Sequence, residues 1–429
     1  MKKLKKFQRM SQEKGITLVA LVITIIILII LATVAISFAF GNNGLIQRAE
    51  DARDYYANDT SYTDESITNV ESYLDEIING VGSGSGGSGG GDGIPEIPMS
   101  EAKGQDEGFS EKTIVVDNQN NKITVPGGFK VADDSGDTVQ QGIVIEDVSA
   151  STDTAVQGSQ YVWIPVGSFV NDAGETKEVV LGRYTFSTTD GTPTLVQDAA
   201  NYTDQSDSVV IDSDYKELVD YREGVASSGL DGENATAKDL AGFLNSARDN
   251  GGYYIGRYEA SFASGDSSNY ATCKAASKVS TANSTSSMSY NPGTLWNRIT
   301  QLDASKVAIN TYVESNSVTS DLLNSYAWDT AIVYIQQAGN SNYANQTSKN
   351  SSLANTGVNA DEVCKINDMA SNVREWTTEY SSLTNSSNAN PCVNRGGDYN
   401  FSSNYTANRF SSIATYSSNI VGFRLSLYL

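Results

Sequence analysis

The chain has 429 residues, 39% of them hydrophobic, and its 51 acidic residues outnumber its 29 basic residues, for a net charge of −22. A surface this negative repels nucleic acid and anionic lipid, so we expect no nucleic-acid partner. The sequence contains no histidine, which removes the commonest general base, the usual copper or zinc ligand and every Ser–His triad.

The first predicted element is a membrane helix over residues 16–40. This run carries no charged residue, and at about 1.5 Å per residue a helix of this length crosses the hydrocarbon core of a bilayer. The leader in front of it holds six Lys and Arg residues against a single Glu. The positive-inside rule keeps such a leader cytoplasmic, so we predict that the remainder of the chain lies outside, at the cell surface.

The junction between Gly15 and Ile16 resembles the cleavage site of type IV prepilins. The resemblance implies a leader over residues 1–15 that a prepilin peptidase removes, with pilin-like subunits or the membrane as partners. The fifth mature residue, usually glutamate in that family, is Ala20, and the resemblance associates this change with minor or tip subunits. A plain membrane anchor and a signal peptide are the alternatives, although the apolar run is longer than a signal-peptide core.

A helical stem and a flexible tether follow the membrane segment. Apolar residues spaced three or four apart within residues 63–78 predict an amphipathic helix, so we extend the stem over residues 16–79. Residues 80–108 form a linker that begins with an almost pure Gly/Ser run. We divide the rest into a β-rich appendage, residues 109–141, and a main domain, residues 142–429.

Local patterns predict several strands and two helices in this head. Residues 113–117 and 122–125 flank a polar Asn/Gln turn and read as a hairpin, and residues 142–145 and 161–165 read as further strands. Helices are predicted over residues 237–249 and 321–338. Ser, Asn and Thr dominate residues 261–291 and 340–355, which we predict to be long loops.

Short motifs rich in Trp, Gly and Arg stand in a defined order along the main domain. They are YVWIP at 161–165, YIGRYEA at 254–260, WD at 328–329, NDMASNVREWT at 367–377, RGG at 395–397 and GFR at 422–424. In this order they resemble the formylglycine-generating enzyme (sulfatase-modifying factor) family. The resemblance implies a C-type-lectin-like fold, so the predicted class is α+β: a long N-terminal pilin-like helix and a lectin-like head rich in loops.

The residues do not support the chemistry of that family. Its oxidising members use a cysteine pair between the Arg-Gly-Gly and Gly-Phe-Arg motifs, and residues 398–421 contain no cysteine. We therefore predict no catalytic residues and no enzyme activity. The three cysteines are Cys273, Cys364 and Cys392; a Cys364–Cys392 disulfide and buried free thiols are both compatible with the sequence.

The resemblance also implies one metal. Relatives bind a structural calcium beside the Glu-Trp motif, and the matching positions here are the side chains of Asp368 and Glu375 with the carbonyls of Ser371 and Val373. An all-oxygen set of this kind suits a hard cation. A solvated or salt-bridged acidic pair is the alternative, and no other cofactor is expected.

Residues 398–419 are the predicted binding region. Tyr, Phe and Arg supply rigid contact area while Ser and Asn adapt their hydrogen bonds, which is the composition of a paratope. The region resembles the variable region of receptors diversified by retroelements, which share the lectin-like fold. An Asn/Ser-rich loop without a ligand is the alternative. The positions assigned to the binding face are Asp398, Tyr399, Asn400, Ser402, Asn404, Tyr405, Asn408, Phe410, Ser412, Tyr416 and Asn419.

Together these patterns predict a surface-displayed adhesin or receptor. A prepilin-like stem carries, on a flexible tether, a head that binds an extracellular protein or glycan through residues 398–419. The two alternatives are a structural minor pilin with no ligand and an enzyme of unfamiliar chemistry on the same fold.

Overall fold

The computed structural model describes residues 94–203, 210–217, 235–284, 290–358, 361–385 and 388–429. The chain divides into two units, Met1–Gly91 and Asp92–Leu429, and every described residue belongs to the second. The predicted leader, the Gly15/Ile16 junction, the stem and residues 80–93 of the linker lie outside the described residues. Among the residues described, no helix has the length and apolar character needed to cross a membrane.

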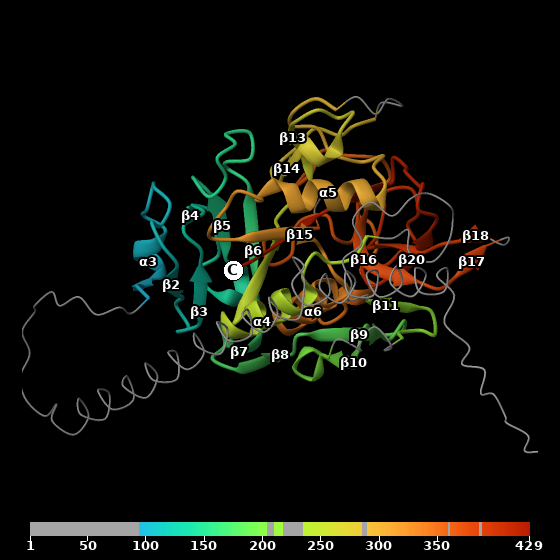
Figure 1. Ribbon diagram of the computed structural model, residues 1–429. Helices are drawn as coiled ribbons and strands as arrows, with labels where there is room; N and C mark the ends of the chain where they lie inside the picture. The colour runs from blue at the N-terminus through green and yellow to red at the C-terminus, as the bar shows by residue number, and fades with distance from the viewer. Residues whose placement is uncertain (1–93, 204–209, 218–234, 285–289, 359–360, 386–387) are drawn as a thin grey trace, which may run out of the picture. The chain divides into compact units, whose positions relative to one another are not determined.

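A six-stranded antiparallel sheet forms the centre of the head (Figure 1). Its apolar strands are buried on both faces, and Val162, Trp163 and Ile164 are at most 1% exposed. Trp163 and Tyr254 are directly opposite each other on neighbouring strands, and their ring centroids lie 5.0 Å apart in an edge-to-face contact. In spatial order the strands are β15 (Thr319–Leu322), β22 (Leu425–Tyr428), β12 (Gly252–Gly256), β6 (Gln160–Pro165), β5 (Val144–Asp147) and β4 (Phe129–Val131).

The predicted hairpin is confirmed as β2 (Thr113–Val116) and β3 (Lys122–Val125). Its turn is held by Asp117, whose carboxylate accepts hydrogen bonds from the backbone N–H groups of Gln119 and Asn121 at 2.8 Å. The hairpin and β1 (Glu96–Pro98), parallel to β2, make a three-stranded sheet. Because β4 pairs with β5, the predicted boundary between residues 141 and 142 falls between two strands of the central sheet.

A five-stranded sheet carries the Arg-Gly-Gly and Gly-Phe-Arg motifs. Most of the neighbouring strands within this sheet pair antiparallel, whereas β21 runs parallel to β16. The segment between its third and last strands in sequence is the predicted binding region. The strands are β11 (Tyr215–Glu217), β16 (Arg374–Ser381), β19 (Cys392–Arg395), β20 (Arg409–Ser412) and β21 (Val421–Phe423).

Both predicted helices are present, but α4 begins three residues after its predicted start at 237, and α6 begins four residues after its predicted start at 321. Helix α4 (Leu240–Asp249) is capped by Asp239, whose side chain accepts from the N–H of Gly242. Helix α6 (Ser325–Gln337) is capped by Asn324. The predicted start at residue 321 is wrong, because Asp321 and Leu322 pair with β22 and form part of β15. Helix α6 packs against both β6 and β16, so it joins the two larger sheets.

A further helix, α5 (Gln301–Thr311), was not predicted. Its buried side is made largely of small and polar side chains, among them Ala304, Ser305 and Ala308, so it shows little apolar periodicity. Thr300 caps it by accepting from the N–H of Asp303. This Thr-x-x-acidic spacing was the signal available in the sequence. A one-turn helix, α3 (Met99–Ala102), follows β1. Both elements lie within residues 80–108, predicted as a linker, so the described end of that segment is part of the folded head, where β1 pairs with β2.

Short two-stranded ribbons complete the head. The region 261–291, predicted as loop, contains one of them, so that prediction is wrong in part; residues 340–355 contain only a 3-10 turn, as expected. The ribbons pair β7 (Gly167–Val170) with β8 (Thr176–Val179), β9 (Gly182–Phe186) with β10 (Pro193–Asp198), β13 (Ser261–Ser264) with β14 (Lys274–Ala276), and β17 (Thr384–Asn385) with β18 (Asn388–Ala389).

Candidate functional site

A buried network of charges underlies the predicted binding region. Arg395 of β19 donates to Asp329 of α6 at 2.7 Å and to Glu379 of β16 at 3.3 Å. Arg409 of β20 reaches the same two carboxylates at 2.7 and 2.9 Å, and Arg183 of β9 donates to Glu379 at 3.1 Å. These side chains are at most 5% exposed. The network therefore ties β9, α6 and three strands of the five-stranded sheet into one rigid base.

The electrostatics of this base are fixed by its three guanidiniums. Burial acts to raise the pKa of Glu379, but Arg409, Arg395 and Arg183 outweigh it and hold that pKa below its ordinary value. Glu379 is therefore an anion in the folded protein. Three arginines surround the two carboxylates, and the charge of Asp212 also acts on Arg409.

Two of the predicted binding residues support the loop from within. Asp398 is fully buried, and one of its oxygens accepts from the backbone N–H groups of Asn400 and Phe401 at 2.8 and 3.0 Å. Its other oxygen accepts from the side-chain amide of Asn404 and from Nε of Arg374, both at 2.7 Å. Asn404 is only 8% exposed. Asp398 and Asn404 thus shape the turn.

The remaining predicted residues reach the surface, and most of them line one of two adjoining pockets. Asn400 and Ser402 are exposed, and the others are half-buried. Tyr399, Asn400, Tyr416 and Asn419 line a pocket of about 430 Å³. Phe410, Ser412 and Tyr416 line one of about 550 Å³. Ser402, Tyr405 and Asn408 lie outside the lining of both, and the carbonyl of Asn408 accepts from Nε of Arg395.

The structure adds residues that the sequence analysis missed. Phe401 and Ile413 are 45% and 40% exposed, large values for apolar side chains. Arg374, on β16, lines both pockets, and its guanidinium carbon lies 3.9 Å from the ring centroid of Phe410 and 5.5 Å from that of Phe401. Strand alternation gave no signal for Arg374, because the seven residues that follow it in β16 are all buried. We call residues 399–401 and 410–419 with Arg374 the loop face.

The residues assigned to calcium lie together beside the start of β16. Both oxygens of Glu375 accept from Arg424, the shortest contact being 2.7 Å. Asp368 accepts from the N–H of Gly357 at 2.8 Å, and its carbonyl accepts from the N–H of Ser371 at 3.1 Å. Glu259 is buried next to them, and burial together with the charges of Asp368 and Glu375 raises its pKa well above the ordinary value.

The carboxylates of this cluster suit a hard cation, but in the structure both oxygens of Glu375 are already paired with the guanidinium of Arg424. Glu259, Asp368 and Glu375 share the single guanidinium of Arg424, so added positive charge would relieve their repulsion. In the part of the chain that the structure describes, no three Asp, Glu or Cys side chains are grouped closely enough to hold a metal. Calcium at Asp368, Ser371, Val373 and Glu375 stays a prediction.

Of the two states compatible with the sequence, a Cys364–Cys392 disulfide and free thiols, the structure has free thiols. No disulfide joins Cys273, Cys364 and Cys392 within the described residues. Cys273 and Cys392 are buried, and burial raises the pKa of Cys364 to about 12. A thiol held protonated in this way is a poor nucleophile.

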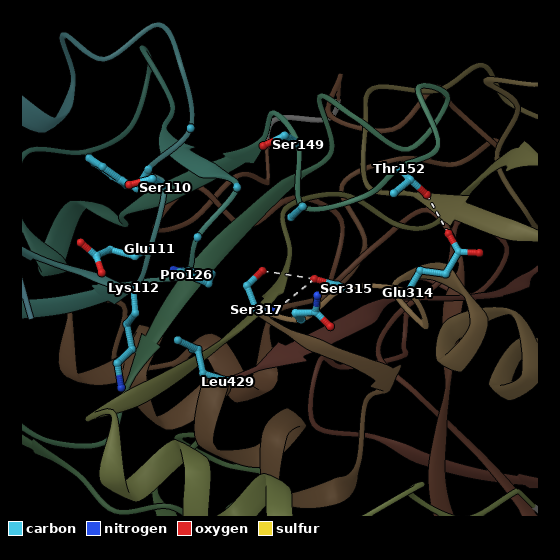
Figure 2. Close-up of a pocket in the computed structure, with 16 residues that line it drawn as sticks. Ser110, Glu111, Lys112, Pro126, Ser149, Thr152, Glu314, Ser315, Ser317 and Leu429 are labelled. Carbon is cyan, nitrogen blue, oxygen red and sulfur yellow. Dashed lines mark hydrogen bonds between the residues drawn. The ribbon is translucent and has the colours of Figure 1, made fainter.

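Another pocket, of about 670 Å³, lies where the β2–β3 sheet meets the loops around residues 150 and 315 (Figure 2). Four of its polar side chains are paired with one another. The hydroxyl of Thr152 donates to Glu314 at 2.7 Å, and the hydroxyls of Ser315 and Ser317 lie 3.2 Å apart. We place the candidate site at the loop face, because six of the predicted binding residues line its two pockets and Phe401 and Ile413 are exposed there.

Comparison with known proteins agrees with the motifs at the C-terminal end. Residues 304–427 match the sulfatase-modifying factor enzyme 1-like domain. This part of the head resembles that domain, and the motifs at 328–329, 367–377, 395–397 and 422–424 all lie within it. No curated protein matches the chain.

Several solved structures are distantly similar. PvdO from Pseudomonas aeruginosa is 14% identical over 42% of this chain and 82% of its own, with a TM-score of 0.29. Treponema denticola variable protein 1 is 12% identical over 64% of this chain and 97% of its own, with a TM-score of 0.26. The Major Tropism Determinant M1 variant is 9% identical over 78% and 98%, also with a TM-score of 0.26.

Proposed function

We propose that the head is a binding module whose recognition surface is the loop face. The observation that carries the proposal is a pair of pockets sharing Arg374 and Tyr416, with Phe401 and Ile413 exposed beside them. Recognition surfaces combine aromatic and arginine anchors with adaptable polar groups, and the loop face has this composition. The ligand is an extracellular protein or glycan.

The buried base supports this role because it separates the surface from the fold. Asp398, Arg395 and Arg409 fix the backbone of the loop from below, while the side chains above them contact solvent. Surface residues on such a base can change without unfolding the head. Diversification of residues 398–419 by a retroelement, which the sequence resemblance implies, would use this separation.

We expect binding without turnover. The side chains that line the two pockets are those of Arg, Tyr, Phe, Asn, Ser and Ile, a set without the thiol, imidazole or carboxylate that acid–base or nucleophilic catalysis uses. The sequence motifs around Gly15 and Ile16 support display of the head at the cell surface, on a stem that a prepilin peptidase processes and that joins pilin-like subunits or the membrane.

The test is a binding screen of the full chain on arrays of extracellular proteins and glycans. A variant carrying Phe401→Ser and Ile413→Ser removes the exposed apolar side chains of the loop face, and Lys112→Ser, at the pocket of Figure 2, is the matched control. We expect ligands that the control retains and the double variant loses. Ligands that all three chains bind equally, or none at all, would favour the structural pilin; conversion of a ligand would favour an enzyme.

A further inference from the structure

Arg374 is held in place by contacts that leave the end of its side chain unused. Its Nε donates to the buried carboxylate of Asp398 at 2.7 Å, and its guanidinium stacks over Phe410. Within the described residues, neither Nη1 nor Nη2 donates to a protein acceptor. An arginine fixed through Nε presents these two groups as a fork, the geometry that binds both oxygens of a carboxylate.

The fork lies at the wall that the two pockets share, and the lining of both pockets favours an anion. Among the described residues that line them, none is Asp or Glu, whereas Arg374 lines both and Arg409 lines one. This contrasts with the chain as a whole, in which acidic residues outnumber basic ones 51 to 29.

We propose that the loop face binds an acidic side chain of a protein ligand, with Arg374 as the residue that forks onto its carboxylate. The inference rests on the proposed function and names the chemistry of its ligand. An Asp or Glu of the partner enters between the two pockets, and the apolar side chains next to it pack on Phe401 and Ile413. Two large apolar side chains exposed beside an arginine match the apolar and arginine anchors of protein interfaces, which favours a protein over an acidic glycan.

The experiment selects ligands without assuming their identity. A random linear peptide library displayed on phage is selected on the immobilised full chain, and the enriched peptides are synthesised in two forms, with each Asp or Glu retained or changed to Asn or Gln. We expect enriched peptides to carry an acidic residue beside apolar ones. The amide forms should bind about ten- to a hundredfold more weakly, the range for a forked charge-assisted pair.

Variants of Arg374 then show whether that carboxylate meets this arginine. In Arg374→Gln the acidic and amide peptides should bind equally weakly, whereas the exposed Arg248→Gln on α4 is the matched control and should leave the difference intact. Because Arg374→Gln leaves Asp398 buried without its cation, the pair Arg374→Gln with Asp398→Asn removes both charges and keeps the loop neutral. Arg374→Lys keeps the charge, lacks the fork and should restore only part of the affinity.

Each other outcome overturns the proposal. If the selected peptides lack acidic residues but their binding depends on Phe401 and Ile413, the proposed carboxylate ligand is wrong and the binding function of the loop face is still supported. Acidic peptides that bind every Arg374 variant equally would place the carboxylate elsewhere. Sialylated or uronic-acid glycans that bind through Arg374, with no peptide enriched, would replace the protein partner by a glycan. No ligand that depends on the loop face would overturn the binding function as well.

Discussion

The two larger sheets of the head are stabilised by different chemistry. The six-stranded sheet is apolar, with Val162, Trp163 and Ile164 buried against neighbouring strands and helices. The five-stranded sheet instead encloses paired charges, with Glu379 and Arg395 completely buried. Apolar packing tolerates small shifts, because it is not directional, whereas each arginine–carboxylate pair fixes distances and angles.

The difference follows what each sheet has to hold. The six-stranded sheet holds the fold, and the five-stranded sheet holds the loop face, whose residues 398–419 contain little regular secondary structure of their own beyond β20. Buried ion pairs add little net stability, because desolvation of the charges offsets most of their attraction. We infer that the role of the network is to keep the backbone of the loop in one conformation. The exposed side chains of the loop can then be replaced without loss of that conformation.

The largest expected effect breaks the ionic base. Glu379→Gln removes the carboxylate that Arg183, Arg395 and Arg409 share and leaves three buried cations around one remaining partner, at a cost of about 3–5 kcal/mol in unfolding free energy. Denaturant unfolding of the full chain measures it. Ile164→Val in the apolar sheet is the control, at about 0.5–1.5 kcal/mol. Equal losses in both variants would remove the distinction between the sheets.

Calcium tests whether the second acidic cluster needs more than Arg424. If Asp368 and Glu375 bind the ion, saturating calcium at about 100 times its Kd stabilises the fold by about 2.7 kcal/mol. Thermal unfolding with calcium, magnesium and a chelator measures the increment. Asp368→Asn should abolish it. An increment that survives this substitution would place the ion at another site.

The apolar sheet has its own pH dependence through Asp321 of β15. Burial raises the pKa of Asp321 to about 7, although the N–H groups of Lys238 and Leu322 oppose the shift. Because the folded state holds this proton more tightly than the unfolded chain, stability rises as pH falls through 7. The gain between about pH 8 and pH 6 is about 1.4 kcal/mol for this one group.

The variant Asp321→Asn isolates that contribution. Its stability should change less between the same two pH values, and the difference from the unaltered chain, measured by urea unfolding, is the share of Asp321. Identical pH profiles would show that other buried acids, such as Glu259, whose pKa is also raised, account for the whole dependence.

The smallest expected effect on stability comes from the loop face itself. Phe401→Ser and Ile413→Ser alter side chains that are already 45% and 40% exposed, so each should change the unfolding free energy by less than about 0.5 kcal/mol. Asp398→Asn removes the charged partner of Arg374 and should lower the unfolding free energy by more than either of these substitutions. A large loss from the exposed pair would mean that these side chains support the fold.

The sequence predicted the elements whose signals are local. The hairpin around residues 118–121, the strand 161–165 and helix α4 follow from apolar alternation, turn residues and apolar spacing. Helix α5 was missed because its buried side is formed by residues such as Ala304 and Ser305. The start of α6 was misplaced because the pairing of Asp321 with Ser426 is set far along the chain.

The candidate site was predictable in location and only partly in detail. Motif order and paratope-like composition indicate residues 398–419, and the composition draws attention to Asn, Ser and Tyr. It cannot show that Asp398 and Asn404 are buried, since their burial depends on Arg374, 24 residues away from Asp398. Phe401 and Ile413 would be assigned to the core from their apolarity alone, and only the fold exposes them.

The most direct test of the account is deep sequencing of the codons for residues 392–429 across a population of the source organism, with a search for a neighbouring reverse transcriptase gene. The account predicts substitutions concentrated at loop-face positions such as Tyr399, Asn400 and Tyr416, with Asp398, Arg395 and Arg409 unchanged. An invariant tract would contradict diversification, and variation that falls equally on the buried charges would contradict the division between a fixed base and a replaceable surface.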